Sequence, residues 1–356
     1  MAATPTKAVT AACHCKQQSF TAAIPVSSLP LNSRVCHCDS CRRSSGCLNT
    51  SAAPWPDALP DNHTLKTQKV FWLVKDVNKL TVFTACLPHE KGIVRYTDHI
   101  YVGDTIDGGL SSWLLSPHFE SAKDSMPISR WKDFDGKSEK LSVEWPGVAA
   151  PAAEDELTGG DRLPIRCRCG GVNLELTRPD YTNSKSSEVP WWVDPDTRRK
   201  WLAVICPCDS CRLTFSSDMV PLSFVDMKNV HAASGVGSTF PSNVVALSEA
   251  VARGDPALGT LAKYQSSKEA FRFHCTKCSA SIFYACDDRP ELLDLAVGVI
   301  HSPDGARAEG MLWWKCTTKS TISHVADIEG GWREELHRGC LQERRQWRVK
   351  RGWKLL

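Results

Sequence analysis

The sequence contains no run of apolar residues long enough to cross a bilayer, which takes about 18 or more. It also lacks an excess of one charge: 43 Lys and Arg residues stand against 40 Asp and Glu, a formal net charge of +3. This balance is too mild to indicate nucleic acid as the main partner. The N-terminal residues contain no apolar core of signal-peptide length. We therefore expect a reducing, cytoplasmic location, with the nucleus as an alternative.

Cysteine, by contrast, is abundant: there are 17 in 356 residues. In a reducing compartment, clustered cysteines bind metal more often than they form disulfides. An odd number also cannot pair completely within one chain. The length predicts two domains, since a domain usually takes about 100–200 residues. The distribution of the cysteines is therefore the first clue to function.

The cysteines recur in the same order in the two halves of the chain. Each half has a Cys-x-Cys pair, then the motif Cys-x-Cys-Asp-Ser-Cys-Arg, then a further pair of candidate ligands. The first half contains Cys13/Cys15, Cys36/Cys38/Cys41 and Cys86/His89, and the second contains Cys167/Cys169, Cys206/Cys208/Cys211 and Cys275/Cys278. This order predicts a tandem duplication with a period near half the chain.

The boundary between the halves is visible in the composition. Residues 146–160 read PGVAAPAAEDELTGG, without a hydrophobic period, which is typical of a linker. We predict a first domain at 1–147, a linker at 148–161 and a second domain at 162–356 with insertions and a basic C-terminal tail. Mostly β structure is expected, with short helices near 247–252 and 334–346 and strands at 70–74, 80–84, 171–176, 271–274 and 281–284.

The outer pairs of each half could form a closed metal site. A structural zinc takes four thiolate or imidazole ligands in a tetrahedron. The candidate sets are Cys13, Cys15, Cys86 and His89 in the first half, and Cys167, Cys169, Cys275 and Cys278 in the second. The alternative is that these are free cysteines of the core.

The central clusters predict a different kind of site. Each supplies three thiolates and no obvious fourth ligand, and three protein ligands with an open position are typical of catalytic zinc. An open zinc lowers the pKa of a bound group and polarises a carbonyl. The alternative is that a distant residue, such as His37 or Cys47, closes each site and makes it structural.

Taken together, these motifs resemble a known family. Cys169-Gly170, the Cys-x-Cys-x-x-Cys-Arg motif and Cys275/Cys278, followed by an apolar strand, are similar to the glutathione-dependent formaldehyde-activating enzymes, whose superfamily includes centromere protein V. The resemblance covers nearly the whole chain as two tandem copies. It implies two mostly β, zinc-binding domains of the β-tent type. It also implies a structural zinc on the outer pairs and a second, substrate-facing zinc on the central cluster, up to two ions per domain.

The resemblance also implies a reaction. The expected activity is that of a carbon–sulfur lyase or synthase, with glutathione as a co-substrate and a small thiol or aldehyde as substrate. The catalytic zinc ligands carried over are Cys36, Cys38, Cys41, Cys206, Cys208 and Cys211. Arg42 and Arg212 follow these clusters and are candidates to neutralise the thiolates or to bind a carboxylate of glutathione.

Both halves depart from the family pattern. The first half has Lys16 where the family has glycine and His89 where it has the last cysteine, so its outer site departs from the family's ligand set. Asp107 and His301 fall near the place of a family acid, where they would differ in acid–base behaviour; the alternative is that both are ordinary loop residues.

Three hypotheses follow. The first is a two-domain, zinc-dependent carbon–sulfur lyase or synthase acting on an electrophile larger than formaldehyde, as in a biosynthetic tailoring step. The second is a non-catalytic zinc-binding module that recognises a protein or nucleic acid with its β surface and its basic C-terminal residues, HRGCLQERRQWRVKRGWK. The third keeps one half active and makes the other a structural partner.

Overall fold

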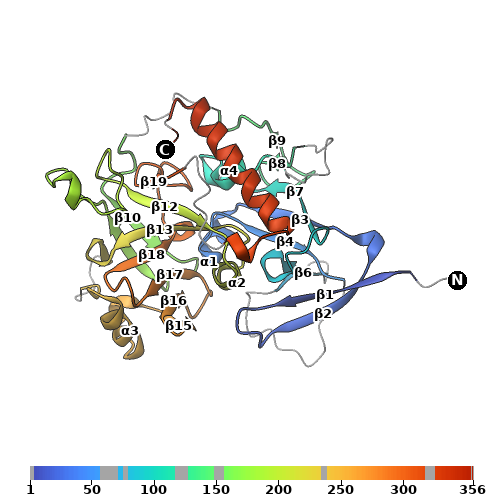
Figure 1. The fold of residues 1–356 in the computed structure, drawn as a ribbon, viewed down its shortest axis with the longest axis horizontal. Helices are drawn as coiled ribbons and strands as arrows, with labels where there is room; N and C mark the ends of the chain where they lie inside the picture. The colour runs from blue at the N-terminus through green and yellow to red at the C-terminus, as the bar shows by residue number, and fades with distance from the viewer. Residues whose placement is uncertain are drawn as a thin grey trace.

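The protein is mostly β, as predicted, in a computed structural model that describes residues 4–56, 71–74, 79–116, 127–147, 156–233, 239–316, 325–353 and 355. The first half lies on the right of Figure 1 and the second on the left, with the C-terminal helix α4 (Trp332–Lys350) running across the top between them. Within these described ranges, no helix combines the length and the apolar character needed to cross a bilayer.

The first half consists of a hairpin and a larger sheet. Strands β1 (Thr6–Ala12) and β2 (Ser19–Pro25) form the hairpin, and their buried residues alternate with exposed ones. The sheet has the order β5-β6-β4-β3-β7-β8-β9. Its strands are β3 (Leu31–Cys36), β4 (Thr50–Pro54), β5 (Phe71–Val74), β6 (Lys79–Phe83), β7 (Val94–Ile100), β8 (Ser129–Trp131) and β9 (Lys140–Leu141).

The second half has a comparable plan with more strands. Strands β10 (Arg162–Arg166), β11 (Asn173–Thr177) and β14 (Val230–Ala232) form one sheet, and β15-β16-β17-β18-β13-β12-β19 form the other. The latter comprises β12 (Trp201–Cys206), β13 (Val220–Asp226), β15 (Leu261–Ser267), β16 (Ala270–Cys275), β17 (Ser281–Cys286), β18 (Leu292–Ala296) and β19 (Leu312–Trp314). Helix α3 (Val244–Ala252) confirms the expected helix near 247–252.

The predicted linker lies between two independent sets of strands. The first-half sheets end with β9 and the second-half sheets begin with β10, and no strand pair of the described residues joins the two sets. Residues 148–155 of the predicted linker lie outside the described residues. The five predicted strands correspond to β5, β6, β11, β16 and β17, with boundaries shifted by a few residues at most.

The strands around the three-cysteine motifs correspond between the halves. Strand β3 has the antiparallel neighbour β4 and the parallel neighbour β7, while β12 has β13 and β19 in the same roles. Beyond β4 and β13 lie β6 and β18, which lead into the 3-10 turns η3 (Thr84–Cys86) and η9 (Val297–Val299). By this topology, Cys86 corresponds to Val299 and not to a cysteine of the Cys275/Cys278 pair.

Two short helices connect the halves reciprocally. Helix α1 (Asp39–Ser45) of the first half ends against η9, where Gly298 N–H donates to the Gly46 carbonyl at 2.9 Å. A Cβ atom at Gly298 would lie 2.2 Å from the Cys47 carbonyl oxygen, so this approach requires glycine. Helix α2 (Asp209–Phe215) of the second half reaches η3, where Arg212 donates to the Ala85 carbonyl.

The basic C-terminal segment forms α4, which is longer than the helix predicted at 334–346. Its Arg333, Arg344 and Arg348 are buried, although a basic run is usually a solvated face. Arg344 lies 4.9 Å from the ring centroid of Trp113, and Arg348 donates to a backbone carbonyl of β19. These three arginines therefore make contacts within the protein, which disfavours this segment as a nucleic-acid surface.

A buried ion pair joins the two halves and α4. Asp218, which follows α2, accepts from Arg333 Nε at 2.7 Å and from Tyr96 Oη of the first half at 2.7 Å. Arg333 also donates to the carbonyls of Thr84 and Leu87. Burial raises the pKa of the Asp218 carboxyl, but Arg333 and the hydroxyl donors outweigh it, and the net pKa is lowered.

We predict that Asp218→Asn lowers the free energy of unfolding by about 3–5 kcal/mol, because Arg333 then remains as a buried charge without its partner. Urea unfolding measures this change. The stabilisation by Asp218 is present at neutral pH and is lost as pH falls below about 4, through its lowered pKa. The control is Glu144→Gln, which removes an exposed ion pair between the first half and Lys350 of α4 and costs at most about 1 kcal/mol. Equal costs for the two variants would contradict this role.

Candidate metal centres and substrate cavity

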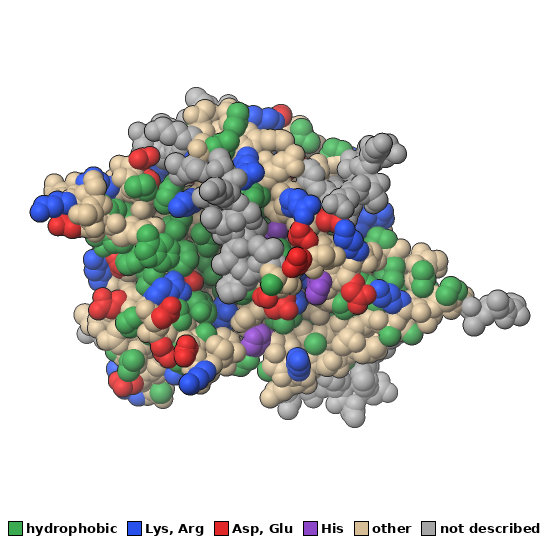
Figure 2. All heavy atoms as spheres, viewed as in Figure 1, with side chains coloured by type: hydrophobic (Ala, Val, Ile, Leu, Met, Phe, Trp, Pro, Cys, Tyr) green, Lys and Arg blue, Asp and Glu red, His purple; other side chains and the backbone are tan. Residues whose placement is uncertain are grey.

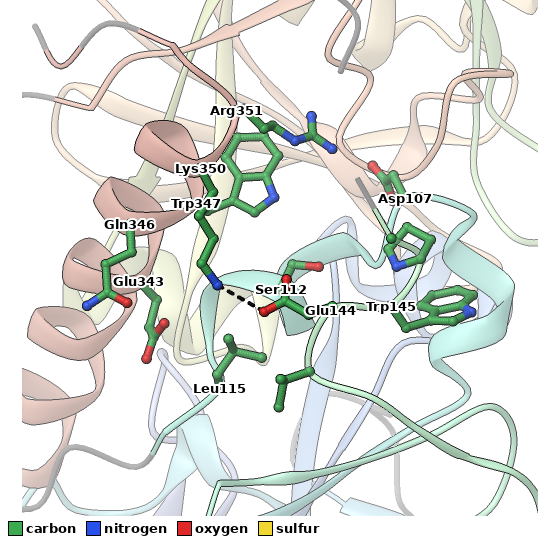
Figure 3. A pocket seen from close by; sticks show the side chains of 13 residues that line it. Asp107, Ser112, Leu115, Glu144, Trp145, Glu343, Gln346, Trp347, Lys350 and Arg351 are labelled. Atoms are coloured by element: carbon green, nitrogen blue, oxygen red, sulfur yellow. Dashed lines mark hydrogen bonds and ion pairs between the residues drawn. The ribbon is translucent and has the colours of Figure 1, made fainter. Parts of the chain in front are cut away.

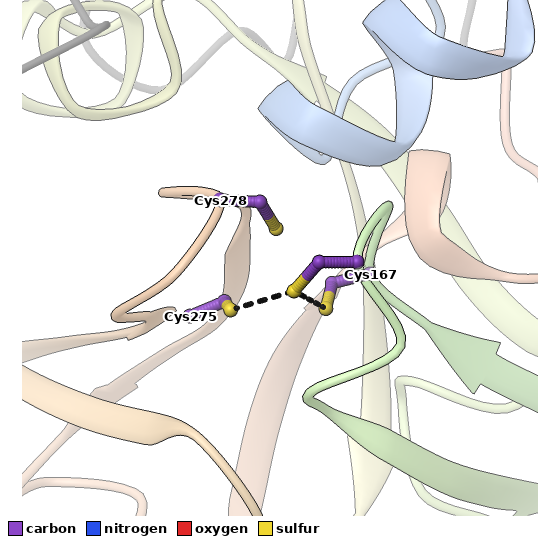
Figure 4. Close-up of side chains that lie close together, drawn as sticks. Cys167, Cys275 and Cys278 are labelled. Carbon is purple, nitrogen blue, oxygen red and sulfur yellow. Dashed lines mark hydrogen bonds between the residues drawn. The ribbon is translucent and has the colours of Figure 1, made fainter.

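The outer pairs of the second half form one compact four-thiol cluster. The Sγ atoms of Cys167, Cys169, Cys275 and Cys278 all lie within 4.8 Å of one another. Figure 4 shows the side chains converging from the β10–β11 turn and the β16–β17 turn. Cys169 Sγ is 3.6 Å from Cys167 Sγ and 3.5 Å from Cys275 Sγ. Tetrahedral zinc with Zn–S bonds of about 2.3 Å separates its sulfurs by about 3.8 Å, so this set fits a zinc ion.

Both central motifs also assemble as predicted. Cys36, Cys38 and Cys41 form one cluster, and Cys206, Cys208 and Cys211 form the other. The middle cysteine is the N-cap of α1 or α2, and its sulfur accepts the backbone N–H of the last cysteine at 3.4 Å in α1 and 3.3 Å in α2. His37, a candidate to close the first site, instead contacts the His99 ring, with 2.9 Å between Nε2 and Nδ1. Neither group includes a fourth ligand from the described part of the chain.

The thiols of each cluster share their protons unequally. Hydrogen bonds from the two neighbouring thiols, with a backbone N–H, lower the pKa of both Cys38 and Cys208 to about 2. The same contacts, with burial, raise the pKa of Cys36 and Cys206. Without a cation, one thiolate per cluster is therefore stabilised at the expense of the others. Three sulfurs crowded in this way suit a divalent, thiophilic ion.

The structure does not bring together Cys13, Cys15, Cys86 and His89. Cys13 and Cys15 are neighbours, with 3.4 Å between their sulfurs, but these four residues are absent from the ligand groups within 4.8 Å. Cys86 is buried in η3, whereas His89 is exposed. The His89 carbonyl accepts a hydrogen bond from the N–H of Trp332, the first residue of α4. Topology explains the difference, because the Cys275/Cys278 turn joins β16 to β17. The corresponding stretch between β4 and β5 contains no cysteine.

Arg42 and Arg212 are held by the protein itself. Each is buried and contacts an aspartate three residues earlier, Asp39 or Asp209, with further bonds to backbone carbonyls. Neither arginine lines the cavity beside the second cluster. Their geometry supports a role in fixing the helix that follows each cluster, and we do not propose them as glutathione-binding residues.

The second central cluster opens onto a cavity of about 740 Å³. This volume is in the range that binds small ligands. Cys206, Cys208 and Cys211 all line it, as do apolar residues of β12 and β13. In Figure 2, hydrophobic side chains gather over the part of the second half where Figure 1 labels β12 and β13, with charged side chains along the lower edge. The cluster is thus placed where a substrate can reach it.

Other parts of the chain contribute to this cavity. His14, from the turn of the first-half hairpin, lines it, and its Nδ1 lies 2.8 Å from the Tyr264 hydroxyl of β15. Leu341 and Arg344 of α4 also line the cavity. Burial, with the charge of Arg272 nearby, lowers the pKa of His14. The site therefore combines both halves, which the sequence left open.

Arg272 of β16 is a residue that sequence reasoning missed. Its Nη1 is 3.2 Å from Cys211 Sγ, and its Nη2 is 3.0 Å from Ser210 Oγ. It also lies 4.3 Å from the Tyr284 ring centroid. The sequence feature that could have identified it is a basic residue between two phenylalanines of a predicted strand, three positions before Cys275. A fixed positive charge at this point offsets the negative charge of the cluster.

Asp294 of β18 is the buried carboxyl of the cavity. It forms an ion pair with Arg289 at 3.1 Å, yet burial raises its pKa to about 6 in spite of that cation and Arg272. Asp107 and His301, the candidates for acid–base work, do not line the cavity. Asp107 accepts from Arg307 N at 2.8 Å, and His301 Nε2 contacts the Arg166 carbonyl.

A smaller hollow lies between α4 and the first half, around Trp145, Trp347 and the Lys350–Glu144 ion pair (Figure 3). Its volume of about 50 Å³ suffices for only a few water molecules. It is therefore unsuited to the substrate.

The fold and clusters define a β-rich protein with three groups of cysteines that could hold metal ions. Residues 8–69 match the family model for glutathione-dependent formaldehyde-activating enzyme. This segment spans the first hairpin and the first central cluster, and it ends before Cys86. Neither a comparison with curated proteins nor one with solved structures gave a significant match.

We predict about three zinc ions per chain, one for each cluster, by elemental mass spectrometry of freshly purified protein. Cys169→Ser should remove one ion, because it breaks the four-thiol set. Cys15→Ser is the matched control: it changes the equivalent exposed cysteine of the first hairpin and should remove none. Loss of one ion in that control would reinstate a site at Cys13, Cys15, Cys86 and His89.

We also predict a pH effect at Asp294. Because its pKa is raised to about 6, the folded state binds this proton more tightly than the unfolded state does. Its contribution to stability therefore falls as pH rises through about 6. Between pH 5 and 8 the wild type should lose about 1 kcal/mol relative to Asp294→Asn, measured by urea unfolding. A difference that does not change with pH would contradict this assignment.

Proposed function

We propose that the chain is a zinc-dependent carbon–sulfur lyase or synthase that acts on a thiol adduct of an aldehyde or related small electrophile. The observation that carries this proposal is the three-thiol cluster of Cys206, Cys208 and Cys211 in the wall of a ligand-sized cavity. The family match at residues 8–69 supports glutathione as the thiol. The second half is, in this proposal, a second copy of the same domain.

The reaction needs no oxidant or reductant. In the cleavage direction, the carbon–sulfur bond of a hemithioacetal breaks, its electrons remain on sulfur, and the carbinol O–H becomes the carbonyl as its proton leaves. The released thiolate takes up one proton. Zinc held by the three cysteines would lower the pKa of the thiol or polarise the carbonyl oxygen.

The residues of the cavity prepare this chemistry. Arg272 holds a positive charge against Cys211, so negative charge near the cluster is stabilised. The apolar residues of β12 and β13 exclude water from one wall, which strengthens electrostatic interactions inside. The Tyr264 hydroxyl holds His14 at the wall, so the first half completes the cavity of the second.

The two central clusters share their local setting. The N–H of Asp39 donates to the Asp104 carboxylate at 3.2 Å, that of Asp209 donates to the Asp327 carboxylate at 2.9 Å, and each helix docks on a 3-10 turn of the other half. They differ in the cavity, which the cysteines of the second cluster line and those of the first do not. We propose that the first cluster holds a metal that fixes α1 in the interface, while catalysis takes place in the second half. The nucleic-acid alternative depended on the basic tail, whose buried arginines disfavour it.

We predict that Cys208→Ala abolishes catalysed exchange between glutathione and formaldehyde, whereas Cys38→Ala retains at least about half of the wild-type rate. The two positions are equivalent N-caps, so the pair is matched. NMR exchange spectroscopy on zinc-loaded protein measures the rate. Equal losses would show two active centres, and loss in Cys38→Ala alone would contradict the proposal.

A further inference from the structure

The cavity extends from the cysteine cluster to an aromatic rim along a chain of contacts. Cys211 Sγ contacts Arg272, which stacks on Tyr284, and Tyr284 is paired with Asp294 across β17 and β18. Asp294 binds Arg289, whose guanidinium lies 5.4 Å from the Phe224 ring centroid. Phe224 packs edge-on against Trp191 at 4.9 Å between centroids, and all of these residues line the cavity.

The rim residue Trp191 is unusually exposed for its size. Its relative exposure is 56%, the highest of the tryptophans among the described residues. Ligand cavities are lined mostly by apolar and aromatic side chains, so an exposed aromatic ring at a cavity indicates a ligand contact more strongly than a single exposed aromatic elsewhere on the surface. Trp191 lies in the insertion between Cys169 and Cys206, which is longer than the segment between Cys15 and Cys36.

The first half provides an internal comparison for the cavity wall. The register Val204↔Leu222 of β12 and β13 corresponds to Arg34↔Ala52 of β3 and β4. The second-half wall thus presents Leu202, Val204, Leu222 and Phe224 where the first half has Asn32, Arg34, Ala52 and Pro54. Arg34 is exposed and binds Asp135. The apolar wall is therefore specific to the half with the cavity.

From this placement we infer that the electrophile carried by the thiol has an aromatic body, which packs against the Trp191–Phe224 pair while its carbon–sulfur bond reaches the cluster of Cys206, Cys208 and Cys211. Formaldehyde alone would leave the apolar wall and the rim unfilled in a cavity of about 740 Å³. Burying an aromatic ring against this wall adds binding free energy that a methyl group cannot supply. The inference rests on the proposed function and names its substrate class.

The test is equilibrium binding of two stable thioethers to the zinc-loaded protein by calorimetry: S-(naphthylmethyl)glutathione and S-methylglutathione. We expect the naphthylmethyl probe to bind at least about tenfold more tightly. Trp191→Ala should remove most of this preference, and Trp191→Phe should keep much of it. Val245→Ala, which truncates an exposed apolar residue outside the cavity, is the control and should change nothing.

The outcomes separate the two claims. Equal affinities for the two probes would overturn the aromatic substrate class and leave the proposed function standing. A preference that survives Trp191→Ala would also overturn it, because the ring would then bind elsewhere. No binding of either thioether would overturn the proposed function together with this inference.

Discussion

The buried ion pair between Asp218 and Arg333 is the contact on which the arrangement of the molecule depends. It joins the end of α2, the first-half strands that carry Ser51 and Tyr96, and the start of α4. Separating a buried charge from its partner is strongly destabilising, so this ion pair holds the three parts in one geometry. Because the first half is fixed against the second, the hairpin that carries His14 reaches the cavity beside Cys208.

The two halves have the same strand arrangement around their central clusters. The strands around each central cluster correspond in order and register, and each cluster caps a short helix with its middle cysteine. The differences lie on the surface that faces the cluster, which is apolar in the second half and carries Arg34 in the first. The four-thiol set likewise occurs in the second half only, within the described part of the chain. The halves therefore share the strand order around the central clusters and differ in the side chains beside them.

The sequence allowed the mostly β fold, the three assembled clusters and the positions of the main strands to be predicted. Local spacing is sufficient there, because Cys-x-Cys and Cys-x-x-Cys turns place their sulfurs together through short chain segments. The sequence also predicted that Cys86 and His89 take the places of Cys275 and Cys278 in a first-half zinc site. The structure does not group them with Cys13 and Cys15, because the order of motifs along the chain does not reveal which strands are neighbours. The cavity, Arg272 and the burial of the α4 arginines depend on contacts between distant segments, which a linear pattern does not record.

Anomalous diffraction on either side of the zinc edge tests the central claim most directly, because it locates each ion within the fold. The account predicts peaks at the four-thiol cluster and at both three-thiol clusters, with the Cys206/Cys208/Cys211 peak at the cavity wall. It predicts no peak beside Cys13 and Cys15. A peak there, or an empty Cys206/Cys208/Cys211 cluster in active protein, would contradict it.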